Sequence, residues 1–579
     1  MPRGPGAHEP PRGFPLHLCM ASSLFRRKPI GALLHHPPPD THNPEPSGEL
    51  DAGGMHRTLG VRDLTFLGVA AVIGAGIFST IGTAAHEGGP GVVFLFIITA
   101  ITCGFTALCY AEFAGRVPVS GSAYTYSYVT FGELVAWVIG WALILEYAIG
   151  NVVVANSWSA YFTNILQAFG VHLPAWMTTD PAAARDAYDA AVGAGSATNG
   201  LAWETAPVLL GWRVIMNVPA ALITMAITAL VYVGIQESKR MANGMVMLKL
   251  VVLAAVAAVG AFHISGANYV PFLPNGMEGV LKGVSAVFFA YIGFDAISTT
   301  AEECRDPQRD MPRGMIYALV ICTLIYCITA LVLTGMVPYA QFKGVSDPLA
   351  FVFERIDMPT FGFVVSISAV VAATSVLLVF QLGQPRIWMS MSRDGLLPPR
   401  FGHLHRKYRT PAFATIVTGI LVAVPALFAP SGIMTDLTSI GTLFAFVLVC
   451  GGVLLLPPQP PDAAPRKRFR MPYINGRYII PVVLFAFVVL ARGRLATAVS
   501  TLDDDGQSLL LLCFLVLASV VTVLTVLRSW SLIPVLGMLS SAYLMIEIPA
   551  RSWLVFFAWM ALGLVGYFAY GHRHSKLAR

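Results

Sequence analysis

Charged residues are scarce in this sequence. Only 12% of the 579 residues are Asp, Glu, Lys or Arg, whereas soluble domains contain about 25%. Hydrophobic residues make up 56% of the chain, and the mean hydropathy is +0.68. This balance excludes an ordinary soluble domain and predicts a chain that lies mostly in lipid.

Several chemical signatures are also missing. The net charge is +6, but no basic run alternates with aromatic residues, so we expect no nucleic-acid partner. The eight cysteines lie scattered, mostly in apolar segments, without CxxC spacing, which favours packing over a disulfide framework or metal site. No Ser/His/Asp triad, carboxylate pair or histidine pair is evident within the apolar segments, so an enzyme is the least favoured class, and we expect no cofactor or metal.

Residues 1–60 are rich in Pro, His, Gly and charge and show no helical period, which predicts a disordered tail. No apolar core of signal-peptide type occurs there. A second methionine, Met20, opens a more ordinary start, so residues 1–19 are interpreted as an over-extended gene start, a hypothesis for N-terminal sequencing.

Apolar segments about 20 residues long recur along the rest of the chain, and each is long enough to cross the roughly 30 Å hydrocarbon core as a helix. The segment at 361–391 is overlong and is expected to emerge into the cytoplasm. The sequence therefore predicts an all-α polytopic membrane protein with about fourteen transmembrane helices. These are near 64–84, 91–115, 131–157, 212–234, 245–264, 279–300, 313–337, 361–391, 411–430, 436–456, 478–494, 508–528, 530–547 and 552–571.

Lysines and arginines alternate with these segments. They gather in the loops near 239, 305–313, 393–409 and 466–477 and are rare in the intervening loops. The positive-inside rule then places both termini in the cytoplasm. The polar stretch 172–211 is expected outside, as an insertion of short helices over the mouth of the protein.

Two apolar segments are interrupted by glycines. The first contains Gly74-Ala75-Gly76 and the second contains Tyr291-Ile292-Gly293-Phe294-Asp295. Unwound backbone at membrane depth is tolerated where it lines a cavity or is buried in protein, and interrupted spans in corresponding places indicate a transporter's substrate site. A helix-packing face of small residues is the alternative for the first break.

The two breaks offer complementary chemistry. Amides freed at the first break would carry a partial positive charge and suit a carboxylate. Carbonyls freed before Gly293 would accept from an ammonium group, and Asp295 lies mid-span, where a charge is costly and usually functional. Together they describe a site for a zwitterion, although Asp295 could instead pair structurally with a buried cation or hydroxyl.

Three other polar residues lie within apolar segments. Lys249 could bind and release a proton if it is buried, or it could snorkel from a helix end to the interface. Asn151 could contact the substrate or tie two helices together, and Glu146 is placed near an interface. Glu302 and Glu303 are expected to contact neighbouring arginines rather than a metal.

Five motifs in order resemble the amino acid–polyamine–organocation superfamily, and more narrowly the bacterial branch of its cationic amino acid transporter family. The resemblance extends from Arg57 to Leu577. The motifs are Arg57-Thr58-Leu59-Gly60, Gly74-Ala75-Gly76-Ile77-Phe78, the stretch 288–303, Met391-Ser392-Arg393-Asp394-Gly395 with the three residues after it, and the ending 570–577.

The resemblance implies an inverted-repeat (5+5) transporter core with discontinuous helices 1 and 6, followed by four further helices. On this basis the core covers 61–456, the added helices 457–571 and a cytoplasmic tail 572–579. It also implies carboxylate binding by the amides of Ala75, Gly76 and Ile77, amine binding by carbonyls of Phe289, Ala290 and Ile292, and organisation of the site by Asp295. Ile73 and Asn151 complete the implied substrate-binding set, and Lys249 falls where proton-coupled relatives carry a lysine.

The expectation is a secondary active amino-acid transporter in a bacterial inner membrane, with uptake coupled to protons and no other coupling ion. A cationic amino-acid uniporter or exchanger is the alternative within transport, and an amino-acid sensor is the alternative outside it. The sequence leans towards neutral, small substrates because the site offers no acid beyond Asp295 for a cationic side chain. Oligomeric state, direction and a small single-span accessory subunit stay open.

Overall fold

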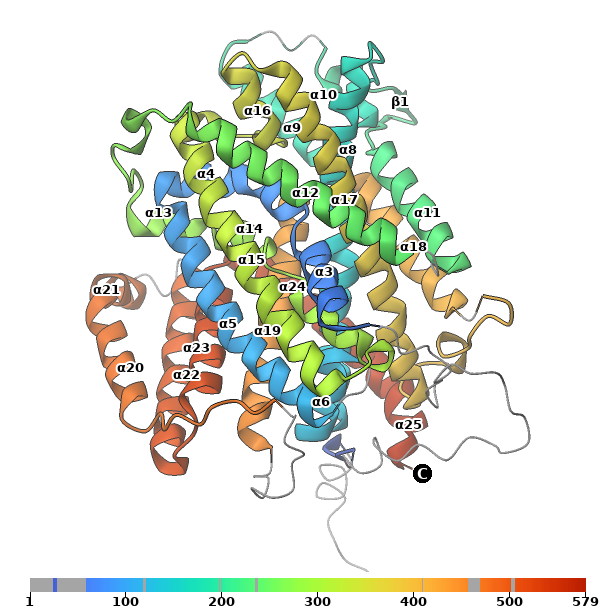
Figure 1. Cartoon of the computed structure of the whole chain (residues 1–579), viewed down its shortest axis with the longest axis vertical. Helices are drawn as coiled ribbons and strands as arrows, with labels where there is room; N and C mark the ends of the chain where they lie inside the picture. Colours follow the sequence, from blue (N-terminus) through green and yellow to red (C-terminus); the bar gives the residue numbers. More distant parts are fainter. Residues whose placement is uncertain are drawn as a thin grey trace, which may run out of the picture.

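A computed structural model describes residues 24–28, 59–117, 121–196, 198, 200–234, 238–408, 410–456, 469–500 and 506–578. The described chain is a bundle of helices, apart from a two-stranded hairpin (Figure 1). Side chains of residues 238–242, Glu302 and Ala578 are not described.

Within these ranges, nine helical stretches are long and apolar enough to cross a membrane, or ten if the bent pair α20 and α21 forms one span. The run Val61–Arg116 contains α3 (Val61–Val72), α4 (Ile81–Gly88) and α5, and thus two of the predicted segments. The protein is therefore a multi-pass membrane protein. The long helices are α5 (Val92–Arg116), α12 (Ser238–Ala261), α15 (Pro307–Met336), α17 (Pro359–Arg393), α19 (Ser431–Leu455) and α22 (Gly506–Arg528).

Shorter apolar helices occupy several of the other predicted segments. The third segment is α7 (Glu133–Ile144) and α8 (Gly150–Ala168), joined through a π-helical stretch, Leu145–Ile149. Near the C-terminus lie α20 (Ile479–Leu490), α21 (Arg492–Ser500), α23 (Leu532–Ile546) and α24 (Ala550–Gly566). Two more are α11 (Val218–Val233) and α18 (Ala412–Phe428).

One predicted boundary is wrong. The segment 212–234 was expected to be helical throughout, but α11 begins only at Val218, where the Asn217 side chain accepts from the Ala220 amide. Residues 208–213 instead form an antiparallel hairpin of β1 (Val208–Leu209) and β2 (Trp212–Arg213). Trp212, Val214, Ile215 and Met216 are apolar, and hydropathy alone does not separate a strand or turn from the start of a helix.

The hairpin belongs to a small cap over one end of the bundle, residues 172–217. The cap contains α9 (Pro181–Gly193) and α10 (Ala202–Thr205). The Asp180 carboxylate starts α9 by accepting from the amides of Ala182 and Ala183 at 3.0 and 2.9 Å, as expected of an N-cap. The cap has its own small core of Ala184, Ala202, Ala206 and Ile215, with Trp176 and Trp203 against it.

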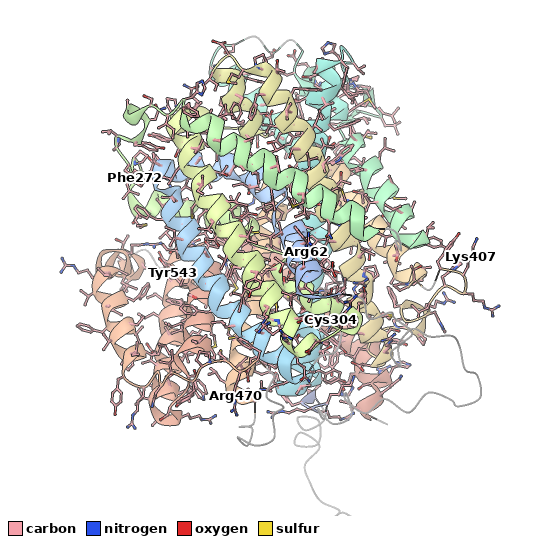
Figure 2. The ribbon with its side chains drawn as sticks, viewed as in Figure 1. Arg62, Phe272, Cys304, Lys407, Arg470 and Tyr543 are labelled. Carbon is pink, nitrogen blue, oxygen red and sulfur yellow. The ribbon has the colours of Figure 1, made fainter. Side chains whose placement is uncertain are left out.

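The opposite end of the bundle carries both ends of the described chain (Figure 1), and we call it the terminal face. In Figure 2, Arg470 lies at this end and Phe272 in the half nearer the cap. The positive residues that set the predicted topology thus include one at the terminal face.

Residues 24–28, within the predicted tail, lie against α6 (Ser122–Thr130) and α7 at the terminal face. The Glu133 amide donates to the Arg26 carbonyl at 3.0 Å, and the Lys28 amide donates to the Tyr128 carbonyl at 3.2 Å. The other residues of 1–58 lie outside the described part of the chain.

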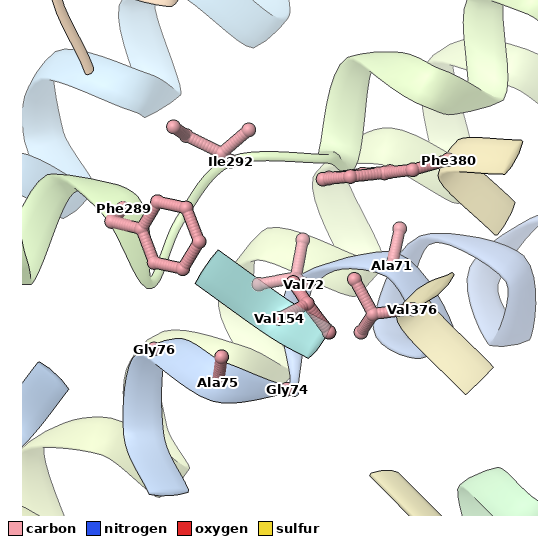
Figure 3. Close-up of a pocket in the computed structure, with 10 residues that line it drawn as sticks. All are labelled: Ala71, Val72, Gly74, Ala75, Gly76, Val154, Phe289, Ile292, Val376 and Phe380. Carbon is pink, nitrogen blue, oxygen red and sulfur yellow. The ribbon is translucent and has the colours of Figure 1, made fainter. Parts of the chain in front are cut away.

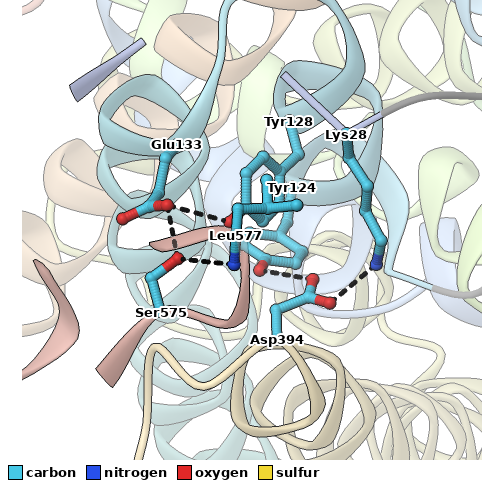
Figure 4. A network of polar contacts seen from close by, with 7 residues as sticks. All are labelled: Lys28, Tyr124, Tyr128, Glu133, Asp394, Ser575 and Leu577. Atoms are coloured by element: carbon cyan, nitrogen blue, oxygen red, sulfur yellow. Dashed lines mark hydrogen bonds and ion pairs between the residues drawn. The ribbon is translucent and has the colours of Figure 1, made fainter. Parts of the chain in front are cut away.

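A polar network, which we call the terminal clasp, joins these segments (Figure 4). The Lys28 ammonium pairs with Asp394 at 2.6 Å, just after α17. The Glu133 carboxylate accepts from the hydroxyls of Tyr567 and Ser575, at 3.0 and 2.5 Å. The N-terminal segment 24–28 and the C-terminal segment therefore both contact the end of α17, at Asp394, and the start of α7, at Glu133.

Candidate functional site

The first predicted break is present. Helix α3 (Val61–Val72) ends at Ile73, whose backbone is extended, and a π-helical stretch begins at Gly76. A Cβ at Gly74 would lie 2.4 Å from Cγ2 of Val376 on α17. Glycine is required here because the chain passes directly against a neighbouring helix.

The second predicted break is present as well. Helix α14 (Val284–Phe289) ends, residues 290–293 turn, and a 3₁₀ stretch follows from Phe294 to Glu303. Gly293 has φ of +112°, and a Cβ there would lie 2.9 Å from the Ala71 side chain. Backbone conformation and close packing both require glycine at this turn.

The two breaks lie against each other. A Cβ at Gly76 would be 2.2 Å from the Cα of Ala290. The Tyr326 hydroxyl on α15 lies 2.8 Å from the carbonyl oxygens of both Val72 and Ala290. Since a hydroxyl has one proton, it can satisfy only one of these carbonyls at a time. Tyr326 was not predicted, because it is one of several aromatic residues in apolar segments and no motif marks it.

A small cavity lies between the breaks (Figure 3). Its lining includes residues of both breaks and the side chains of Val154, Val376 and Phe380, and none of the lining residues is charged. Ala75, Gly76, Phe289 and Ile292 from the predicted set line it, whereas Ile73, Ile77, Ala290, Asn151 and Asp295 are outside the lining. The lining residues are Ala71, Val72, Gly74, Ala75, Gly76, Val154, Phe289, Ile292, Val376 and Phe380.

Sequence reasoning did not find Val154, Val376 or Phe380. They come from α8 and α17, and their spacing is that of any buried apolar face. Their proximity to the breaks arises from the packing of α17 against α8 and α3.

Lys249 is fully buried in the middle part of α12. Its ammonium nitrogen donates to the carbonyl oxygens of Ala70 and Ile73 at 3.0 and 2.7 Å, and to Oγ of Ser375 at 3.0 Å. The three acceptors match the three N–H groups of an ammonium. The snorkelling alternative is thereby excluded, since the side chain turns to the first break and α17, not to an interface.

Asp295 is fully buried, and its carboxylate accepts from the Tyr147 hydroxyl at 3.4 Å. Glu146 lies beside it and is also fully buried. Its expected place near an interface is wrong, because α7 and α8 continue through the π-helical stretch and carry Glu146 into the core. A proton shared between the two carboxyl groups would remove their repulsion.

Asn151 is buried on α8, and its amide nitrogen donates to the Leu377 carbonyl at 3.3 Å and to Oε1 of Gln381 at 3.1 Å. Its own side-chain oxygen has no hydrogen-bond partner among the described residues. Asn151 therefore ties α8 to α17, as one of its two predicted roles required, and its side-chain oxygen has no donor among the described residues. The expected contact of Glu303 with an arginine is confirmed by its 2.8 Å ion pair with Arg386.

Comparisons with known proteins agree with this architecture. Residues 59–520 match the amino acid permease family, and residues 532–575 match the C-terminus of such permeases. The branched-chain amino acid permease BcaP of Bacillus subtilis is 37% identical over 96% of this chain and all of its own length.

A methylthioribose transporter of the same organism is 35% identical, over 96% of this chain and 99% of its own length. The vacuolar cationic amino acid transporter 2 of Arabidopsis thaliana is 36% identical over 76% of this chain and 64% of its own length. The breaks, the cavity between them and these matches lead to one conclusion: the chain belongs to the amino acid permease family, a family of membrane transporters and not of enzymes.

Proposed function

We propose that this permease is a proton-coupled importer of neutral amino acids that works by alternating access. The observation that carries the proposal is Lys249, whose ammonium holds two carbonyls of the first break and a hydroxyl of α17. A neutral amine has two N–H groups, so losing the proton breaks at least one of these bonds. Protonation of Lys249 would thus bias the position of α3 relative to α17.

The proposed substrate lies between the breaks. Its carboxylate accepts from the amides of Ala75, Gly76 and Ile77, at the start of the second half of the broken helix, where intrahelical acceptors are lacking. Its ammonium donates to carbonyls of Phe289, Ala290 and Ile292. Since the Ala290 carbonyl lies 2.8 Å from the Tyr326 hydroxyl, the ammonium takes the place of that hydroxyl.

The remaining predicted residues, Ile73, Asn151 and Asp295, lie around the proposed substrate site. Ile73 adjoins the amides and accepts from Lys249, Asn151 offers its unused side-chain oxygen, and Asp295 organises the second break through its bond from Tyr147.

The apolar cavity supports an uncharged side chain as the substrate class. Val154, Phe289, Ile292, Val376 and Phe380 supply its side-chain walls. A guanidinium or ammonium placed there would lose water without gaining an acceptor, which costs several kcal/mol in order of magnitude. The name of BcaP, a branched-chain amino acid permease, is consistent with aliphatic substrates here.

The proposal includes the finer architecture predicted from the sequence: a 5+5 inverted repeat, fourteen spans, and both termini in the cytoplasm of a bacterium. The proton is the coupling ion, and no cofactor takes part. The alternatives are a cationic amino-acid uniporter or exchanger, in line with the names of the plant relatives, and an amino-acid sensor.

The test is uptake of radiolabelled leucine, alanine and arginine into proteoliposomes, with and without an inward proton gradient. We expect leucine and alanine to accumulate only with the gradient and arginine not to compete. Equilibration of arginine without any effect of the gradient would replace the proposal with a uniporter. Binding without transport of any of the three would favour a sensor, and uptake of methylthioribose alone would overturn the amino-acid site.

A further inference from the structure

The hairpin of the cap exposes apolar side chains. Val208, Leu209, Leu210 and Trp212 are 62%, 67%, 94% and 81% exposed. They are consecutive apart from Gly211, so they form one apolar tip. A contiguous exposed apolar patch on a membrane protein outside its helices marks a contact with lipid or with another protein.

The turn of the hairpin has leucine, Leu210, at a position where Asn or Gly is favoured. Leu210 and Gly211 have φ of +51° and +83°, as in the two-residue turns that prefer Asn-Gly or Gly-Gly. A bulky residue with positive φ is strained. The presence of leucine at the most exposed point therefore indicates that its apolar side chain has a use there.

The base of the hairpin is fixed to the bundle. The Val214 amide donates to the Pro207 carbonyl, and the Asn217 amide donates to Leu427 at the end of α18, both at 2.9 Å. The Arg213 guanidinium turns back to the cap, where it donates to the Trp203 carbonyl and lies 5.4 Å from the Trp203 ring centroid. The charge thus faces the cap and the tip faces away from it.

The hairpin directly precedes a short span. Helix α11 has 16 residues, or about 24 Å at 1.5 Å per residue, some 6 Å less than the hydrocarbon core of about 30 Å. Leu222 and Met225 are exposed on this helix, as expected of a lipid-facing surface. In Figure 1 the hairpin lies at the outer margin of the molecule, just beyond the first turn of α11.

We propose that the tip 208–212 inserts into the interfacial layer of the bilayer beside α11 and anchors the cap to the membrane. Trp212 with three aliphatic side chains is the composition found at membrane interfaces, and residues 208–212 contain no charge. The tip lies just beyond the first turn of α11, a helix with exposed apolar side chains, and this proximity makes lipid, rather than a second copy of the chain, its occupant. This inference is independent of the substrate and of proton coupling.

Spin labels test the insertion. The variant Leu210→Cys is made in a full-length background with Cys19, Cys327 and Cys513 replaced by serine, because the other cysteines are buried. The matched control is Val192→Cys, which is also exposed in the cap but lies on α9. Both labelled proteins are placed singly in phosphatidylcholine–phosphatidylglycerol nanodiscs, and gel filtration confirms that they are monodisperse.

We expect the label at position 210 to collide several-fold more with oxygen, relative to a water-soluble nickel chelate, than the label at 192. Transfer of the same protein to an amphipol without lipid should abolish the difference. Equal water accessibility at both positions would overturn the proposal. Dipolar coupling between labels at 210 in proteoliposomes, with no lipid signal in single-copy nanodiscs, would assign the tip to a second copy and overturn it as well.

Discussion

At the scale of single residues, Lys249 and Gly76 mark the two halves of the proposed mechanism. The Lys249 ammonium is held by two carbonyl oxygens and one hydroxyl oxygen, and not by an acidic side chain of the described residues. A buried cation held only by neutral acceptors has less to stabilise its charge than one in an ion pair. This environment suits a group that must gain and lose a proton during a transport cycle.

We expect Lys249→Ala to abolish accumulation driven by a proton gradient while exchange of labelled for unlabelled substrate continues. Alanine can neither bind the proton nor hold Ala70 and Ile73 to Ser375. Gradient-driven uptake and counterflow exchange are both measured in the same proteoliposomes. Lys282→Ala is the control, since Lys282 is exposed. Gradient-driven accumulation at the wild-type level would remove Lys249 from the coupling mechanism.

Gly76 acts through the absence of a side chain. In Gly76→Ala the new methyl group would meet the Ala290 backbone at 2.2 Å, so the two breaks must separate. We expect destabilisation of about 1–3 kcal/mol and loss of substrate binding. Thermal unfolding and binding are compared with Gly432→Ala, where nothing lies within 4 Å. Normal affinity would mean that the first break serves packing only.

At the scale of elements, the carboxyl group of Asp347, which lies between two helices, predicts that the free energy of unfolding depends on pH. Asp347 precedes α16 (Pro348–Arg355) and accepts from the Asn164 amide of α8 at 2.6 Å. Burial, and next the nearby Glu354, raise the pKa of Asp347 to about 6. The folded protein then binds this proton more tightly than the unfolded chain does. Its stabilising contribution is complete below the unfolded pKa near 4 and is lost as the pH rises through 6.

We therefore expect Asp347→Asn to stabilise the protein at pH 8 by about 1–3 kcal/mol, and to have little effect at pH 4. Asparagine keeps an acceptor for Asn164 but carries no charge to bury. Thermal midpoints across pH 4–8 measure this, with Asp186→Asn on the exposed part of α9 as the control. A constant difference between Asp347→Asn and the wild type across this range would refute the titration.

Some elements of the fold could be predicted from the sequence and others could not. Both helix breaks were predictable, because glycines at 74, 76 and 293 interrupt segments whose hydropathy otherwise demands a continuous helix. The hairpin at 208–213 was not, since Trp212 and the apolar residues 214–216 directly precede α11, and hydropathy alone does not separate a strand from a helix. Tyr326, Val376 and Phe380 were also missed, because their roles arise from contacts between segments far apart in sequence. Glu146 was misplaced for a different reason: α7 continues into α8 through the π-helical stretch, and this carries Glu146 into the core.

At the scale of the whole molecule, the terminal clasp joins four distant parts of the chain. Residues 24–28, helix α6 with the start of α7, the loop after α17 and the C-terminal segment from Tyr567 onward share its bonds. Glu133 is its centre, since its buried carboxylate accepts from Tyr128, Tyr567 and Ser575. The C-terminal segment is thereby fixed to α7 and to the loop after α17.

We expect Glu133→Ala to lower the free energy of unfolding by about 3 kcal/mol, because three hydroxyls in a largely buried site lose their acceptor. The detergent-solubilised protein should show a lower thermal midpoint and faster proteolysis of its last residues, while substrate affinity stays unchanged. Glu278→Ala, an exposed acid on the opposite half of the molecule, is the control.

The contribution of the N-terminal segment to the clasp can be separated in the same assay. Lys28→Met removes the pair with Asp394 and retains an apolar stem over Tyr128. Because the pair is partly exposed, its loss should cost only about 0.2–1 kcal/mol, and added salt should reduce the difference. If Lys28→Met were as damaging as Glu133→Ala, the N-terminal segment rather than the Glu133 hydroxyl cluster would hold the terminal face together.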